Sequence, residues 1–266
     1  MEIEPIDVLT AVLRVMPAIA PVAAMALALI VWLRLLALGQ WLRERGRERY
    51  ALYADFVITN AGILGALFVS AWTAEQLGGA PVANLLADLR LTGGAETNLL
   101  AGATVGLLAT YFAIAALSER VSVLLGEHES PFAAAMRPQT VGERFVWVSV
   151  MSPAAGFCEE VIFRGVLLSI AFTFGADAVI AVALTSLAFG LGHAVYGLTW
   201  TIGTTLLGAV SAVSVLACDS LWPAIVAHTI YDMTVYYVFD TARLEETPDD
   251  GVHAPARTLR GLTPLR

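Results

Sequence analysis

The stretch 178–218, "AVIAVALTSLAFGLGHAVYGLTWTIGTTLLGAVSAVSVLAC", runs for 41 residues and contains no Asp, Glu, Lys or Arg, so that His193 is its single side chain able to carry a charge near neutral pH. A helix that crosses a bilayer needs about 20 apolar residues, so this stretch is too long for one span. Glycine and polar residues concentrate at "HAVYGL", residues 193–198. We therefore predict a break there, with one helix at 177–193 and a second at 198–217.

The composition of the whole chain agrees with a membrane protein. Of the 266 residues, 58% are hydrophobic and 14% are charged, and the mean hydropathy is +0.74. Soluble domains carry about 25% charged residues. Only helices and closed barrels satisfy their backbone polar groups inside lipid, and the sequence has no alternating strand pattern. The predicted fold class is all-α, a polytopic membrane helical bundle.

Hydropathy places seven to eight transmembrane helices in this bundle. Besides the two helices above, long apolar runs lie at 15–33, 56–74, 97–118, 145–176 and 221–239. An eighth element follows if Pro153 and Gly156 split the run 145–176, or if the segment 5–14 lies in the membrane interface. We divide the chain into N-terminal membrane scaffold helices and loops (1–144), a catalytic membrane core (145–239) and a polar C-terminal tail (240–266).

Arginine counts predict the orientation in the membrane. Loop 39–50 carries four Arg and loop 119–144 carries three, whereas loop 75–96 carries one. Basic loops stay in the cytoplasm, which puts the N-terminus outside. All 15 basic residues are Arg and none is Lys. This bias favours a prokaryotic source, and with it an inner or cytoplasmic membrane.

Three charged residues interrupt the apolar run 145–176. They are Glu159, Glu160 and Arg164 in "CEEVIFRG", and each costs about 2.5–3.5 kcal/mol at the centre of a membrane helix. Glu160 and Arg164 are four residues apart, so they share a helical face and can pair. Glu159 lies about 100° around the helix from Glu160. It is therefore left without that partner, and the pattern marks it as a candidate functional carboxylate.

Two histidines also lie in apolar helices. His193 follows Phe189 by four residues, which places an aromatic ring beneath the imidazole, and His228 precedes Asp232 by the same spacing. By simple counting His193 ends its helix near the cytoplasmic face, whereas His228 begins the last helix near the outer face. If the two converge, either 193–198 dips into the membrane or the helix 198–217 is short or tilted.

These residue types admit four chemistries. A desolvated Glu can act as general base for water in peptide hydrolysis, with His side chains sharing the water and stabilising an oxyanion. Two His and one Glu can hold zinc, although no HExxH motif is present. Acids and His also form ion or proton relays in transporters, and a purely structural polar network is the fourth alternative.

The two cysteines and the two remaining histidines are expected to take no part in catalysis. Cys158 and Cys218 are expected to be buried free thiols rather than a disulfide. His128 and His253 lie in polar segments and are expected at the surface. No nucleic-acid partner is expected, because the chain has no basic stripe.

Three motifs in order resemble those of the CAAX protease and bacteriocin-processing family (CPBP, or Abi), which is related to the eukaryotic CAAX prenyl endopeptidase. "EEVIFRG" at 159–165, "FGLGH" at 189–193 and "HTIYD" at 228–232 look like its motifs EExxxR, FxxxH and HxxxN/D. The resemblance covers about 145–236 and implies a glutamate-type intramembrane protease with a conical helical cavity.

The resemblance also implies roles for individual residues. Glu159 would activate water with His193 as its partner, and His228 and Asp232 would stabilise the oxyanion. The shaping residues would be Glu160, Arg164 and Phe189. In the eukaryotic CAAX enzyme the last motif ends in Asn, whereas an ionised Asp232 cannot donate a hydrogen bond. Asp232 is therefore either protonated or orients His228 from behind, and we favour the second alternative.

The expected cofactor is none, with zinc on Glu159, His193 and His228 as the alternative. The expected partners are membrane lipids and a membrane-associated protein or peptide substrate. Two other function classes stay open beside a protease: a non-catalytic immunity or scaffold membrane protein, and a transporter.

Overall fold

A computed structural model describes residues 44, 46–76, 89–91 and 95–246. The predicted span 15–33, the segment 5–14, His253 and most of the predicted tail lie outside these residues. The chain divides into two compact units, 1–233 and 234–266. The second unit is described over residues 234–246, which are helical. The site discussed below lies in the first unit.

The described residues form helices joined by turns and contain no strand, which confirms the all-α prediction. The long helices are α2 (Glu48–Gln76), α4 (Thr97–Leu125), α9 (Ala178–Gly192), α10 (Leu198–Cys218) and α11 (Trp222–Glu246). The short elements are α5 (Pro131–Met136), α6 (Val141–Val146), α7 (Ser152–Glu160), α8 (Leu168–Thr173), the π-helical turns η1 (Trp147–Met151) and η2 (Val161–Leu167), and the 3₁₀ turn η3 (Ala194–Tyr196).

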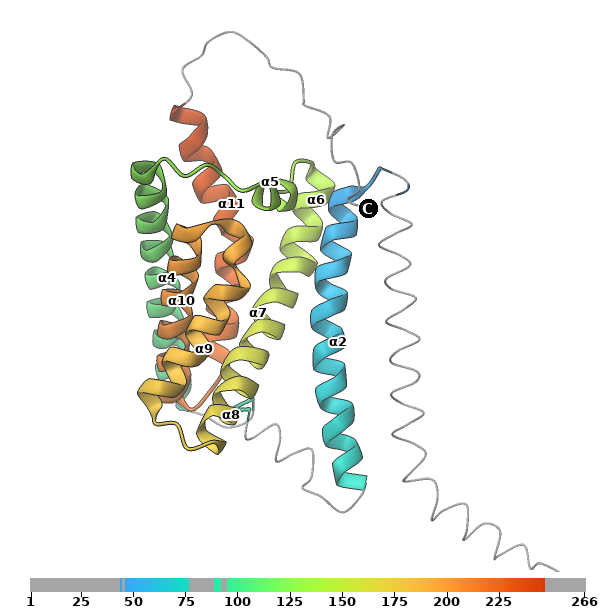
Figure 1. The fold of residues 1–266 in the computed structure, drawn as a ribbon, viewed down its shortest axis with the longest axis vertical. Helices are drawn as coiled ribbons and strands as arrows, with labels where there is room; N and C mark the ends of the chain where they lie inside the picture. The colour runs from blue at the N-terminus through green and yellow to red at the C-terminus, as the bar shows by residue number, and fades with distance from the viewer. Residues whose placement is uncertain (1–43, 45, 77–88, 92–94, 247–266) are drawn as a thin grey trace, which may run out of the picture. The chain divides into compact units, whose positions relative to one another are not determined.

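The predicted break in the uncharged stretch is confirmed. α9 ends at Gly192, η3 occupies Ala194–Tyr196 and α10 begins at Leu198. Gly197 makes the reversal with φ +112°, a conformation that favours glycine. α9 and α10 then pack against each other along their length, and α10 also packs on α4 (Figure 1).

The elements α6, η1, α7, η2 and α8 follow one another without a break over residues 141–173 (Figure 1). Pro153 and Gly156 lie inside this run, so they do not split it into two spans. Proline lacks an N–H and crowds the carbonyl four residues earlier. The π turn η1 precedes it, and the Ser152 N–H reaches back five residues to the Trp147 carbonyl. This wider turn accommodates the proline without ending the helix.

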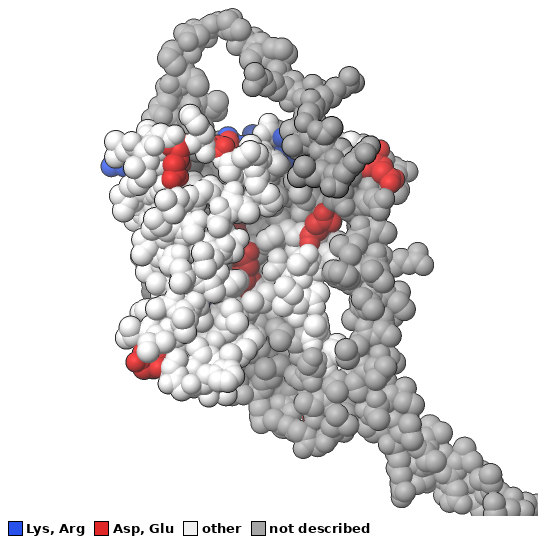
Figure 2. All heavy atoms as spheres, in the orientation of Figure 1, with Lys and Arg blue, Asp and Glu red and all other residues white. Residues whose placement is uncertain are grey.

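Among the described residues, α4 and α10 are long and apolar enough to cross a membrane. α9 is apolar but has only 15 residues. Large apolar side chains on these helices point outward, including Leu124, Val179 and Ile202. On the face shown in Figure 2, most atoms are uncharged, and charged side chains gather mainly at one end. The total of seven to eight spans stays a prediction.

One predicted loop differs in the structure. The segment 119–144 was expected to be a loop, but α4 continues to Leu125, and α5 and the start of α6 lie in the remainder. Glu119 and Arg120 end the apolar run without ending the helix. The helix stops where Gly126 adopts φ +67° and caps it, with the Gly126 N–H on the Ser122 and Val123 carbonyls.

Candidate active site

The three sequence motifs converge on Glu159. This residue lies near the end of α7 and is 8% exposed. Its Oε2 atom lies 3.9 Å from Nε2 of His193, which follows the end of α9, and 3.9 Å from Nε2 of His228 in α11. Oε2 has no hydrogen-bond partner among the described residues. A buried carboxylate oxygen therefore faces two imidazole nitrogens just beyond hydrogen-bonding distance.

α9 is shorter than α10, and His193 caps its end. Fifteen residues of α helix span about 22 Å, whereas the 21 residues of α10 span about 31 Å. η3 and Gly197 make the reversal between the two helices. α10 keeps full length, so convergence does not come from a short α10.

Glu160 is fully buried and connects two motifs. Its Oε1 accepts from Arg164 Nη1 at 3.1 Å, the predicted i,i+4 pair, and from His228 Nδ1 at 2.8 Å. Asp232 lies on the other side of that ring, with Oδ2 3.6 Å from His228 Nε2. The expectation that Asp232 stands behind His228 is thus wrong in geometry, because Glu160 from a neighbouring helix occupies that position.

The hydrogen bonds at both Nδ1 atoms determine what the Nε2 atoms present. His193 Nδ1 lies 2.9 Å from the Phe189 carbonyl, which can only accept, so Nδ1 carries the hydrogen. His228 Nδ1 likewise donates to the Glu160 carboxylate. In their neutral forms both imidazoles therefore direct an Nε2 lone pair toward Glu159. Three acceptors facing one space suit a molecule with two donor hydrogens, as in water.

Aromatic packing fixes the rings of the site. The Arg164 guanidinium lies 4.1 Å from the Phe189 ring centroid, and that ring lies 4.6 Å from the His193 ring. A Cβ at Gly208 of α10 would lie 3.1 Å from Arg164 Nη2, so glycine leaves room for the guanidinium. Phe189 and Gly208 together hold Arg164 against Glu160.

The arrangement fits zinc poorly. Ligand atoms around a tetrahedral zinc with bonds of 2.0–2.1 Å lie about 3.3 Å apart, and the two Nε2 to Oε2 distances are 3.9 Å. Within the described part of the chain, no group of three or more His, Cys, Asp or Glu side chains is placed to hold a metal ion.

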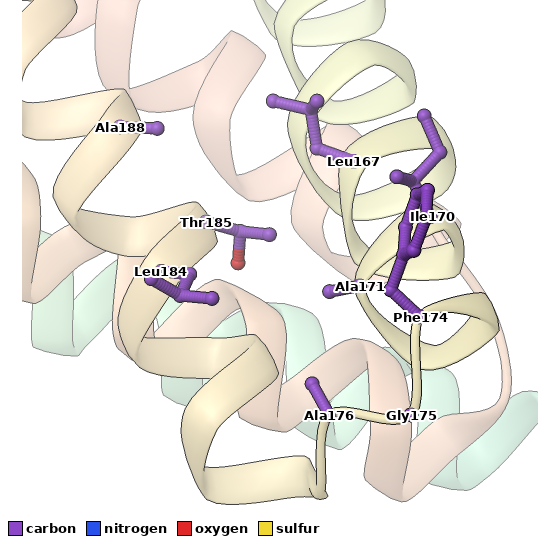
Figure 3. A pocket seen from close by; sticks show the side chains of 9 residues that line it. All are labelled: Leu167, Ile170, Ala171, Phe174, Gly175, Ala176, Leu184, Thr185 and Ala188. Atoms are coloured by element: carbon purple, nitrogen blue, oxygen red, sulfur yellow. The ribbon is translucent and has the colours of Figure 1, made fainter.

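The two cysteines and His128 have the exposure that the sequence predicts. Cys158 and Cys218 are buried free thiols, as expected. His128 is exposed in the turn after α4. A cavity of about 500 Å³ lies between α8 and α9 (Figure 3) and has an apolar lining apart from Thr185, whose hydroxyl donates to the Ala181 carbonyl. None of the predicted site residues lines it.

Two residues near the site were not anticipated. Tyr196 lies in η3, and its ring stacks on that of His193 with centroids 5.9 Å apart. Trp147 donates its indole N–H to the backbone carbonyl of Asp232 at 2.8 Å and so fixes α11 beside the site. Tyr196 carried a sequence signal, since it is the one hydroxyl-bearing side chain in the predicted break. Trp147 carried none.

Comparison with protein-family models finds a match over part of the chain. Residues 141–234 match the family model described as Rce1-like, type II CAAX prenyl endopeptidase Rce1-like. This range includes all seven predicted site residues. Comparison with curated proteins and with solved structures returns no match.

Proposed function

We propose that the chain is a glutamate-type intramembrane endopeptidase, on the premise that residues 141–234 match the Rce1-like family model of type II CAAX prenyl endopeptidases. The family is membrane-embedded and implies CAAX-type intramembrane protease activity. The single observation that carries the proposal is the approach of His193 and His228 to the unbonded Oε2 of Glu159. The substrate class we propose is a membrane-associated protein or peptide.

The first step uses the acceptors around Glu159. A water donates one hydrogen to Glu159 Oε2 and the other to His193 Nε2, which holds a lone pair because its Nδ1–H is bound to the Phe189 carbonyl. Glu159 takes the first proton as the water oxygen attacks the carbonyl carbon of the scissile bond.

The second step concerns the charge that develops on the carbonyl oxygen. His228 in its protonated form presents an Nε2–H to this oxyanion. The imidazolium is compatible with its surroundings, because Glu160 lies 2.8 Å from Nδ1 and Asp232 lies 3.6 Å from Nε2. Protonated Glu159 then gives its proton to the leaving nitrogen as the C–N bond breaks, which returns the carboxylate. No metal is part of this scheme.

The decisive variant is Glu159→Gln, which keeps the shape of the side chain and removes the base. General-base catalysis contributes about 10²–10⁴-fold, so we expect cleavage to fall by at least about 100-fold. The measurement is hydrolysis of fluorogenic membrane peptides, prenylated and unprenylated, by purified protein in detergent. Glu96→Gln is the matched control, since Glu96 is exposed and makes no side-chain cap at the start of α4.

Metal analysis separates the zinc alternative. Activity of the wild-type chain is measured after treatment with a strong chelator, with the metal content determined in the same sample. The proposal expects full cleavage without bound zinc. Cleavage that disappears with the metal and returns with added zinc would establish the zinc mechanism. Full activity of the Glu159→Gln variant would exclude both mechanisms and favour an immunity or scaffold protein with a contaminating protease.

A further inference from the structure

Tyr196 is attached to the site through His193. It lies three residues after His193, and its backbone N–H donates to the His193 carbonyl at 3.0 Å. The two rings are nearly parallel, with an interplanar angle of 26° and centroids 5.9 Å apart. The Tyr196 side chain is therefore placed by the same turn that places the imidazole.

A second segment holds this turn from outside. The Phe132 ring, from α5, meets the Tyr196 ring edge-on with centroids 5.3 Å apart. Ser130 caps α5 by accepting from the Ala133 N–H. Glu127 lies 3.4 Å from the Thr199 backbone N–H at the start of α10. The chain between α4 and α6 thus packs on the turn that carries Tyr196 and His193.

The Tyr196 hydroxyl is a potential hydrogen-bond donor on the ring that stacks on His193. Burial, and then the charges of Glu159 and Asp232, hold the pKa of this phenol well above its ordinary value. The phenol therefore keeps its proton at any physiological pH. Within the part of the chain that the structure describes, no group forms a hydrogen bond with the hydroxyl. The phenol is thus a neutral donor on a ring that stacks against His193, the partner of the proposed base.

The proposed mechanism has few donors for an oxyanion. Glu159 and Asp232 are acceptors when ionised, and both neutral imidazoles present lone pairs at Nε2. Only a protonated His228 donates. We propose that Tyr196 is a further catalytic residue, whose hydroxyl donates a hydrogen bond to the oxyanion formed from the scissile carbonyl. This inference rests on the proposed function. No proton leaves Tyr196, so the balance of the two steps above is unchanged.

The test is Tyr196→Phe, which keeps the ring contacts with His193 and Phe132 and removes the hydroxyl. Loss of one oxyanion donor costs about 10²–10³-fold in kcat, so we expect kcat to fall about 100-fold while KM stays unchanged. A purely structural role of the ring predicts no change in kcat, because the ring remains. Tyr50→Phe, at the start of α2, is the matched control for losing a phenol hydroxyl, and it is expected to keep wild-type kinetics.

Glu159→Gln, assayed beside Tyr196→Phe on the same peptides, separates the two levels of inference. Wild-type kcat in Tyr196→Phe, together with an inactive Glu159→Gln, would overturn the role of Tyr196 alone. Full activity in both variants, or a wild-type chain that cleaves none of the peptides, would overturn the proposed function and this inference with it. A fall in kcat with a raised KM and a lowered unfolding temperature would also overturn the donor role, since it shows a displaced turn.

Discussion

Glu160 balances the charges at the base of the site. It is fully buried and contacts both Arg164 and His228. Removing one member of a buried ion pair leaves the other charge without compensation and costs about 3–5 kcal/mol, whereas replacing both by apolar residues of similar volume is often neutral. Stability and activity should therefore respond differently when this pair is changed.

We expect Glu160→Met and Arg164→Met each to lower the free energy of unfolding by about 3–5 kcal/mol. The double variant should recover most of that loss, because neither buried charge remains. It should stay inactive, because His228 has lost the acceptor at Nδ1. Denaturant unfolding in detergent micelles and peptide cleavage measure the two effects. A double variant that loses the sum of the two single losses would show that the two residues are not coupled. An active double variant would show that His228 needs no acceptor.

At the level of residues, the sequence predicts contacts between side chains of one helix from their spacing. It does not predict contacts between side chains of different helices. The pairing of Glu160 with Arg164, and the separate position of Glu159, followed from the helical period. The contact between Glu160 and His228 joins residues 68 positions apart. It depends on the distance and rotation between α7 and α11, which no periodicity in either helix contains. Asp232 was therefore given the position that Glu160 occupies.

The packing of α9 on α10 fixes the position of His193 along the helix axis. A Cβ at Gly190 would contact the Thr205 side chain and lie 2.8 Å from the Thr201 carbonyl, which is backbone and cannot rotate away. We expect Gly190→Ala to push the helices apart, lower stability by about 1–3 kcal/mol and reduce cleavage. Gly192→Ala is the control, because nothing lies within 4 Å of the added Cβ. Equal effects of the two changes would mean that this contact does not position His193.

At the level of elements, hydropathy predicted the helices better than their irregularities. The predicted helices 177–193 and 198–217 correspond to α9 and α10 within one residue at each end. The π turns η1 and η2 were not predicted, because a wider turn changes hydrogen bonding without changing the apolar pattern. The end of α4 was misplaced, since hydropathy marks where a helix leaves an apolar environment and not where its hydrogen bonds stop.

Over the described residues, many large apolar side chains are exposed on the surface of the molecule. α4 carries Leu99, Val105, Leu117 and Val123 as exposed side chains, and its composition is that of a membrane span. Polar turns lie beyond both of its ends, with Glu96 and His128 exposed there. If α4 crosses the bilayer, these two residues must lie on opposite sides. The segment that follows α4, which carries Arg137 and Arg144, should then be cytoplasmic.

Cysteine labelling tests this orientation directly. Both native cysteines are buried, so the wild-type chain should not react with a membrane-impermeant maleimide. We expect Glu96→Cys to be labelled in intact cells, because it lies outside, and His128→Cys to be labelled only after the membrane is opened. The reverse pattern would contradict the arginine-based orientation. Labelling of both residues in intact cells would show that α4 does not cross the membrane, and the seven to eight predicted spans would have to be reduced.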